Sequence, residues 1–118
     1  MPYLQLITNV QLDDERKMDL VKSLSKVAAT ALKKPEEYMS VSYEYNSTLI
    51  FAGTSEPCFQ IGLISIGLTP QACPDVSASI AAELKSKLGV DPSRGYMNLQ
   101  DPTAGRIGYA ETTFAQLK

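Results

Sequence analysis

The chain has no histidine and no tryptophan, and its net charge is only −2. Without histidine, the Ser-His-Asp and Cys-His nucleophile schemes are excluded, and a metal site of the zinc type is not expected. An enzyme of this composition that works near neutral pH needs another base. The candidates are a carboxylate or a lysine with a shifted pKa, or the terminal amine.

The chain also lacks long runs of basic residues and long runs of apolar residues. No basic run is present, which argues against nucleic acid or an anionic membrane as the main partner. No apolar segment approaches the roughly 20 residues that a membrane span requires. The first residues lack the basic region and apolar core of a signal peptide. We therefore expect no nucleic-acid partner, no membrane insertion and a cytoplasmic location.

Cysteine is scarce, since only Cys58 and Cys73 are present and no Cys-x-x-Cys occurs. This pattern favours free thiols in a reducing compartment over a disulfide. No cofactor is expected.

The first nine residues place a proline directly after the initiator methionine. Pro2 has a small side chain, so we expect methionine removal, which would leave Pro2 as a free secondary amine. The apolar residues Leu4, Leu6 and Ile7 predict a buried strand over about 3–8 that would hold this amine in place. The alternative is an ordinary frayed terminus with no role.

The remaining periodicity predicts two helices and three further strands. Asp13 caps a helix over about 14–33. A second helix begins near Pro70 or Pro74 and ends at Leu88, where Gly89 is a good C-terminal cap. Alternating or β-branched segments predict strands over about 38–45, 59–66 and 96–100.

The two halves of the chain repeat one plan, with Tyr-Met at 38–39 recurring at 96–97. We interpret the chain, residues 1–118, as one domain of two pseudo-repeats, about 1–57 and 58–118. The predicted fold is α+β: duplicated β-α-β units form a four-stranded mixed sheet with two helices on one face.

Two helices cover only one face of such a sheet, yet the first strand carries apolar side chains on both faces. Tyr3 and Ile7 alternate with Leu4 and Leu6, so the uncovered face needs a partner and an oligomer is expected. The segments 105–109 and 112–114 are expected as short extensions that pair with a neighbouring subunit.

Short motifs occur along the chain in a fixed order and spacing: Met1-Pro2, Thr8-Asn9-Val10, Lys34-Pro35-x-x-Tyr38, Phe51-x-Gly53-x-Ser55-Glu56-Pro57-Cys58, Ser65-Ile66-Gly67, Arg94-x-Tyr96-x-Asn98, and Ile107-Gly108-Tyr109 with Thr113-Phe114. Together they resemble the macrophage migration inhibitory factor family of the tautomerase superfamily, from the first residue to about Ala115. The resemblance implies a homotrimer around a central barrel, with a pocket between subunits. It also implies keto–enol tautomerisation of small aromatic acids such as phenylpyruvate, or of dopachrome-type compounds.

The resemblance also implies roles for individual residues. Pro2 matches the catalytic base and Lys34 the lysine beside it. The positions that match substrate-binding residues are Ser65 and Ile66 on the same subunit, Tyr96 and Asn98 reaching in from the neighbouring subunit, and Tyr38, Ile107, Tyr109 and Phe114 as walls. Apolar walls and the charge of Lys34 would disfavour the protonated amine, and Lys34 with Asn98 would bind the substrate carboxylate or the developing oxyanion.

Each role has a plainer alternative. Lys34 fits a lysine at a helix end, and the tyrosines fit ordinary strand aromatics. Tyr109 stands where many members have tryptophan, and Glu111 would weaken acidic substrates if it faced the pocket. The rival function is a cytokine-like signalling or binding protein that keeps the fold, with the pocket vestigial or used for docking and a protein receptor as partner. The resemblance also implies, beside the cytoplasm, a second location outside cells, reached by a route without a signal peptide. An isomerase or dehalogenase of the wider superfamily is disfavoured.

Overall fold

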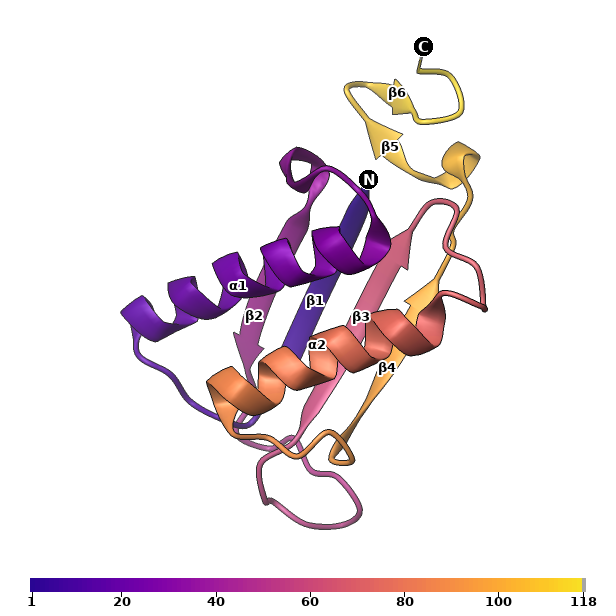
Figure 1. The fold of residues 1–118 in the computed structure, drawn as a ribbon. Helices are drawn as coiled ribbons and strands as arrows, with labels where there is room; N and C mark the ends of the chain where they lie inside the picture. Colours follow the sequence, from indigo (N-terminus) through magenta and orange to yellow (C-terminus); the bar gives the residue numbers. More distant parts are fainter. Residues whose placement is uncertain (118) are drawn as a thin grey trace.

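The protein, described for residues 1–117 by a computed structural model, consists of two β-α-β units followed by a small hairpin (Figure 1). The first unit contains β1 (Pro2–Thr8), α1 (Asp14–Leu32) and β2 (Ser40–Tyr45), and the second contains β3 (Phe59–Ser65), α2 (Cys73–Leu88) and β4 (Gly95–Gln100). A 3-10 turn, η1 (Glu36–Tyr38), precedes β2. After β4 come η2 (Ala104–Arg106), β5 (Gly108–Tyr109) and β6 (Thr112–Thr113).

The four long strands form one mixed sheet in the order β2-β1-β3-β4. Each unit pairs its own strands in parallel, and the two units meet where β1 and β3 pair antiparallel. Both helices lie on the same face of this sheet (Figure 1). The prediction of an α+β fold with a four-stranded mixed sheet and two helices on one face is confirmed.

Both helices begin and end where the sequence indicates. The Asp13 side chain accepts a hydrogen bond of 2.8 Å from the backbone N–H of Arg16, so the predicted N-terminal cap of α1 is confirmed. Helix α2 has Pro74 in its first turn and ends at Gly89, which has a φ of 69°. Lys33 ends α1 with a φ of 57°, a conformation that glycine adopts more readily.

The core lies between the helices and one face of the sheet. Alternate residues of β1 and β3 point into it because side chains along a strand alternate between faces. The fully buried large side chains there include Leu4, Leu6, Phe59, Leu63, Leu20, Leu24, Ile80 and Leu84. Burying one such side chain stabilises the fold by about 1.5–3 kcal/mol.

The opposite face of the sheet has no covering element among residues 1–117. Tyr3, Ile7 and Tyr96 lie there, which agrees with the expected apolar side chains on both faces. The register shows that this open face also carries many polar side chains, at positions 5, 42, 44, 60, 98 and 100. The open face is therefore mixed in character, and less apolar than the first strand alone suggested.

The predicted strand over 38–45 begins later than expected, because residues 36–38 form η1. The N–H of Tyr38 donates to the carbonyl of Pro35 at 3.2 Å, and that of Met39 to the carbonyl of Glu36 at 2.9 Å. Tyr38 therefore lies in a turn and not in the sheet.

The C-terminal extensions pair with each other in this chain, Gly108 with Thr113 and Tyr109 with Thr112. That they also pair with a neighbouring subunit stays a prediction. The resulting hairpin projects beyond the sheet at the end where the chain begins (Figure 1). It thus brings residues 107–109 and Phe114 close to Met1 and Pro2.

The loop that joins the two units, 46–58, is held by one residue from each. The Asn9 side chain donates to the carbonyls of Leu49, Ser55 and Glu56 and accepts from the N–H of Cys58. The Arg94 guanidinium donates to the carbonyl of Phe51 at 2.9 Å and to that of Glu56 at 3.0 Å. No helix of residues 1–117 is long and apolar enough to cross a membrane.

Candidate active site

The start of β1 opens into a cavity of about 240 Å³. Pro2 is buried there, and its backbone lies opposite Ser65 in the β1–β3 register. The lining comes from the N-terminus, from η1 with the start of β2, and from the C-terminal hairpin; its residues are Met1, Pro2, Tyr3, Glu37, Tyr38, Met39, Ser40, Ile107, Gly108, Tyr109 and Phe114. Segments from both ends of the chain thus surround Pro2.

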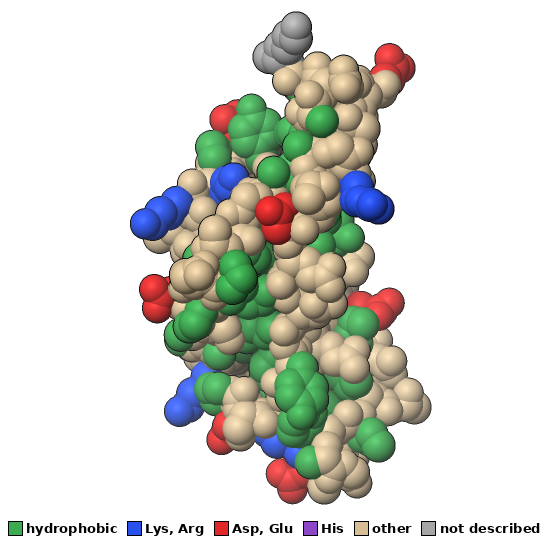
Figure 2. Space-filling model, turned by 90° about the vertical axis from the view of Figure 1, so that its right-hand side faces the viewer, with side chains coloured by type: hydrophobic (Ala, Val, Ile, Leu, Met, Phe, Trp, Pro, Cys, Tyr) green, Lys and Arg blue, Asp and Glu red, His purple; other side chains and the backbone are tan. Residues whose placement is uncertain are grey.

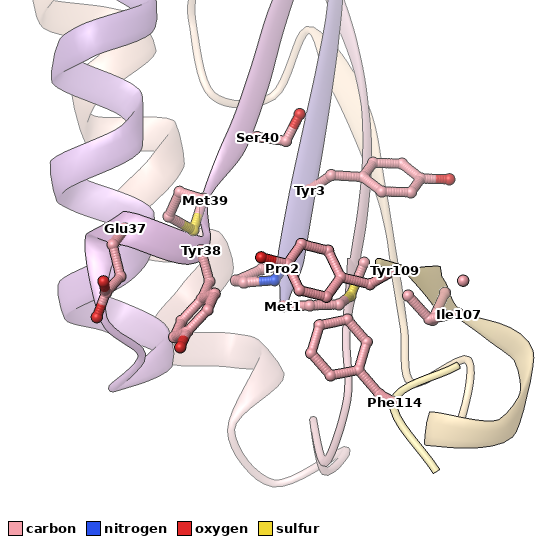
Figure 3. Close-up of a pocket in the computed structure, with 11 residues that line it drawn as sticks. Met1, Pro2, Tyr3, Glu37, Tyr38, Met39, Ser40, Ile107, Tyr109 and Phe114 are labelled. Atoms are coloured by element: carbon pink, nitrogen blue, oxygen red, sulfur yellow. The ribbon is translucent and has the colours of Figure 1, made fainter. Parts of the chain in front are cut away.

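Aromatic side chains form the walls of this cavity. Tyr109 and Phe114 stack with their ring centroids 5.3 Å apart and their planes at 20°. In Figure 3 this pair lies on one side of Met1 and Pro2, and Tyr38 lies on the other. Stacked rings favour a flat apolar or aromatic ligand, which would lie between these walls over the buried proline.

The hairpin that carries the stacked pair is fixed by backbone hydrogen bonds. The N–H of Phe114 donates to the carbonyl of Ile107 at 3.0 Å, and that of Ala115 to the carbonyl of Ala104 at 3.2 Å. Its turn consists of Ala110 and Glu111, both with positive φ, at 51° and 69°. Two such residues in succession match the twist of a tight hairpin. Tyr109, in β5, and Phe114, directly after β6, therefore lie on the same face of the hairpin, where they stack.

The electrostatic environment at the chain's start favours a neutral amine. Burial, and then the positive charge of Lys34, lower the pKa of the Met1 amine below its ordinary value. Both causes disfavour the protonated form, the first by removing water and the second by repulsion between like charges. The sequence analysis expected these two causes for the Pro2 amine that methionine removal would free, and in the structure they act on the Met1 amine.

Lys34 and Ser65 line a second, smaller hollow of about 140 Å³ between the end of α1 and the start of α2. The Ser65 hydroxyl is buried and has no hydrogen-bond partner among the described residues. A buried hydroxyl without a partner is costly, so this oxygen is available to a water or a ligand. Ile66 follows β3 directly and lines neither this hollow nor the cavity at Pro2.

Tyr96 and Asn98 lie elsewhere, on the open face of β4, in a shallow hollow of about 340 Å³ shared with Gln5, Ile7 and Gln60. This hollow and the cavity at Pro2 have no residue in common. Tyr96 is 77% exposed, and its ring meets Phe51 edge to face at 5.3 Å. Figure 2, which views the molecule from the right-hand side of Figure 1, shows hydrophobic side chains through the middle of this side and charged ones mainly around its margin.

Of the ten predicted site residues, the structure therefore brings five together in one cavity: Pro2, Tyr38, Ile107, Tyr109 and Phe114. Lys34 and Ser65 lie in the neighbouring hollow, and Tyr96 and Asn98 are separate. The sequence analysis missed Tyr3, Glu37, Met39 and Ser40. Glu37 stands beside Tyr38 inside a motif already noted, which is the signal that could have found it.

Glu111, which was considered as a carboxylate near the pocket, lies exposed in the hairpin turn and is not among the lining residues. Residues 1–117 contain no group of three His, Cys, Asp or Glu side chains placed to hold a metal ion. The groups around Pro2 are thus the Met1 amine, whose pKa is lowered, and the aromatic walls, with the exposed Glu37 at the margin.

Comparison with known proteins adds to this geometry. The model of the family described as macrophage migration inhibitory factor (MIF) matches residues 1–115. A macrophage migration inhibitory factor homolog of Trichuris trichiura is 32% identical over 115 residues, covering 97% of this chain and all of that protein. D-dopachrome decarboxylase-B of Xenopus laevis is 33% identical over 96 residues, 80% of each chain.

Solved structures with a similar fold include members of the same family. The solved structure of the macrophage migration inhibitory factor from Trichinella spiralis superposes with a TM-score of 0.85 at 28% identity, covering 94% of this chain and 98% of that one. The family match spans nearly the whole chain, including both the Pro2 strand and the C-terminal hairpin. The chain belongs to the macrophage migration inhibitory factor family.

Proposed function

We propose that the protein is a keto–enol tautomerase that uses Pro2, after removal of Met1, as its general base on phenylpyruvate-like or dopachrome-like substrates. The observation that carries the proposal is the position of Pro2, which is buried between aromatic walls. Burial and the charge of Lys34 lower the pKa of the adjoining Met1 amine, and the same surroundings would act on a Pro2 amine freed by loss of Met1. One relative carries the name D-dopachrome decarboxylase-B, which supports dopachrome chemistry as a family activity.

Tautomerisation moves one proton between carbon and oxygen without changing the composition of the substrate. In the keto-to-enol direction, the Pro2 nitrogen would accept a proton from the carbon next to the carbonyl, and the electron pair of the C–H bond would form the C=C bond. The carbonyl oxygen then takes up a proton, and the amine returns to its neutral state. An amine whose pKa is lowered towards the working pH suits both halves of this transfer.

The Lys34 ammonium is the group we assign to the negative charge that develops on oxygen. Lys34 is half-buried, and its charge reaches the terminal amine. Ser65, with its unpaired hydroxyl in the same hollow, would hold a water or a polar group of the substrate. Ile66, at the end of β3, is proposed as a pocket residue only from the family resemblance.

We further propose that the active form is a homotrimer in which Tyr96 and Asn98 act in the pocket of a neighbouring subunit. Two observations support this. Both side chains lie on the uncovered face of the sheet, and neither reaches the Pro2 cavity of its own chain. That cavity, at about 240 Å³, also falls just below the roughly 300–1,000 Å³ usual for ligand pockets, so a further wall would complete it. The division into pseudo-repeats 1–57 and 58–118 remains a proposal that the matched order of elements supports.

The test is Pro2→Gly, assayed on enol phenylpyruvate and on dopachrome methyl ester after intact mass has shown that Met1 is absent. We expect kcat/KM to fall by about 100-fold or more, the scale of a lost general base. Pro92→Gly, in the exposed turn before β4, is the matched control and should keep normal turnover. Equal rates for the Pro2 variant and the parent protein would exclude Pro2 as the base.

A further inference from the structure

The loop between the two units carries one aromatic side chain that contacts a predicted site residue. Phe51 meets the ring of Tyr96 edge to face, with the centroids 5.3 Å apart and the planes at 63°. Tyr96 is 77% exposed, so most of its side chain touches nothing in its own chain. The direction in which Tyr96 projects from the open face therefore depends on where the Phe51 ring lies.

A tight turn presents Phe51 to the sheet. Phe51 and Thr54 exchange two backbone hydrogen bonds, of 3.1 and 3.0 Å. Ala52 and Gly53, between them, both have positive φ, at 53° and 76°, as the common two-residue turn of a hairpin requires. The turn fixes its own shape, but its residues are exposed, so its place against the sheet must come from contacts outside it.

Arg94, the residue before β4, supplies such contacts. Its guanidinium donates to four carbonyl oxygens of the loop, those of Phe51 (2.9 Å), Glu56 (3.0 Å), Pro57 (3.3 Å) and Thr54 (3.5 Å). Its Cζ also lies 5.3 Å from the centroid of the Phe51 ring, within the range of a cation–π contact. Arginine has five N–H donors in a planar fork, whereas lysine has a single ammonium, so this set of bonds requires arginine.

Tyr96 and Pro2 lie at opposite ends of the sheet. In the register, Tyr96 stands opposite Gln60, and Gln60 opposite Ile7, five residues along β1 from Pro2. At about 3.3 Å per residue, the two levels are roughly 17 Å apart. Figure 1 shows the loop and the start of β4 at one end of the sheet and the start of the chain at the other. The Tyr96 ring is therefore out of reach of the Pro2 of its own chain.

We propose that Arg94 is a positioning residue, which through the Phe51 ring sets the direction of Tyr96 and thereby the affinity of the neighbouring subunit's pocket for substrate. The inference rests on the proposed function, in which Tyr96 acts in that pocket. Without its support, the Tyr96 ring would turn more freely, and substrate binding would have to order it. The effect belongs in KM, because Tyr96 is assigned to substrate binding and not to proton transfer.

The first experiment observes Tyr96 directly, by fluorine NMR of protein labelled with fluorotyrosine, where Tyr96→Phe assigns the signal by removing it. Phe51→Leu keeps the backbone bonds to Arg94 but removes the ring, so the Tyr96 signal should move towards that of free fluorotyrosine. Arg94→Lys keeps the charge but loses the fork of donors, and it should move the signal in the same direction. Asn46→Ala, which removes two bonds from Thr48 at the start of the same loop, is the matched control and should leave the signal in place.

The second experiment measures turnover of phenylpyruvate by the Met1-free proteins. We expect Phe51→Leu and Arg94→Lys each to raise KM about fivefold, the scale of one aromatic contact, and to leave kcat within about twofold. Phe51→Tyr, which keeps a ring, should retain the KM of the parent protein. In a Tyr96→Ala background, Phe51→Leu should have no further effect, because the two residues act through one contact. A role confined to folding would instead lower the thermal unfolding midpoint without this coupling.

An unmoved Tyr96 signal in Arg94→Lys, or an equal shift in Asn46→Ala, would overturn the inference. So would additive effects of Phe51→Leu and Tyr96→Ala on KM, or a Tyr96 signal that moves while KM keeps its parent value. If the parent protein turns over no phenylpyruvate, the tautomerase proposal fails, and the fluorine signal then decides by itself whether Arg94 positions Tyr96.

Discussion

The two β-α-β units share one layout but use the dipeptide Tyr-Met differently. Met39 and Met97 both pack against the core. Tyr38, 45% exposed, lies in η1 and lines the Pro2 cavity, whereas Tyr96, 77% exposed, lies inside β4 on the open face. The same pair of residues thus forms a pocket wall in one unit and an outward surface in the other.

The residue before each tyrosine explains this difference. Aligned on Tyr-Met, Glu37 stands where the second unit has Gly95. A Cβ at Gly95 would lie 2.3 Å from the carbonyl oxygen of Phe59, so only glycine lets β4 begin there against β3. In the first unit, the pairing of β1 with β2 begins only at Tyr3 and Ser40, so η1 lies outside the sheet, where it lines the cavity.

The strongest test of this comparison concerns the core that the two units share. Leu4 and Leu63 are paired across β1 and β3, and both are fully buried. We expect Leu4→Ala and Leu63→Ala each to lower the free energy of unfolding by about 2–5 kcal/mol, since each leaves a cavity in the same core. Urea titration measures both values. A loss below about 1 kcal/mol in one variant alone would mean that the units have separate cores.

A second test replaces Gly95, the glycine by which the second unit differs from the first just before Tyr-Met. Gly95→Ala should cost about 1–3 kcal/mol, because the added methyl group meets backbone and the strand must shift. Gly62→Ala is the control, since a Cβ at that position meets nothing within 4 Å. The two variants are compared by thermal unfolding, together with amide exchange at residues 95–97. Equal stability of the two would contradict the close-approach explanation of where β4 begins.

The smallest expected effect concerns the ends of the helices. Both end in a left-handed residue, Lys33 in α1 and Gly89 in α2. Gly89→Ala should destabilise by about 1 kcal/mol, because a Cβ there has space but an unfavourable φ. Lys33→Gly should stabilise by about 0.5 kcal/mol, the relief of φ being partly offset by the lost charge at the helix end. If both changes had the same sign, the ends would not differ in backbone strain.

Sequence reasoning predicted the sheet and the helices well because local patterns determine them. The alternation around Leu4 and Leu6, the cap at Asp13 and the stop at Gly89 each act within a few residues. The family resemblance supplied the pocket residues at Pro2, Tyr109 and Phe114. Periodicity alone would have left these as ordinary strand or loop positions.

The features that sequence reasoning did not predict depend on contacts between segments far apart in the chain, which a local pattern does not reveal. The start of β2 was placed too early, because alternation continues through Tyr38 while residues 36–38 form a 3-10 turn and pairing with β1 begins only at Ser40. Pairing of β5 with β6, and the position of Glu37 in the cavity in place of Glu111, follow from three-dimensional proximity of distant segments.

The central claim is that a free Pro2 amine is the base, and it can be tested by comparing the same chain with and without Met1. Protein made with and without an inhibitor of methionine removal is verified by intact mass and assayed on enol phenylpyruvate across pH. We predict that the Met1-free form is active, with kcat/KM rising through an amine pKa below the ordinary terminal value, because only the neutral amine accepts the proton. The Met1-bearing form, whose Pro2 nitrogen is locked in an amide, should be slower by about 100-fold or more. Equal turnover of the two forms would contradict the account.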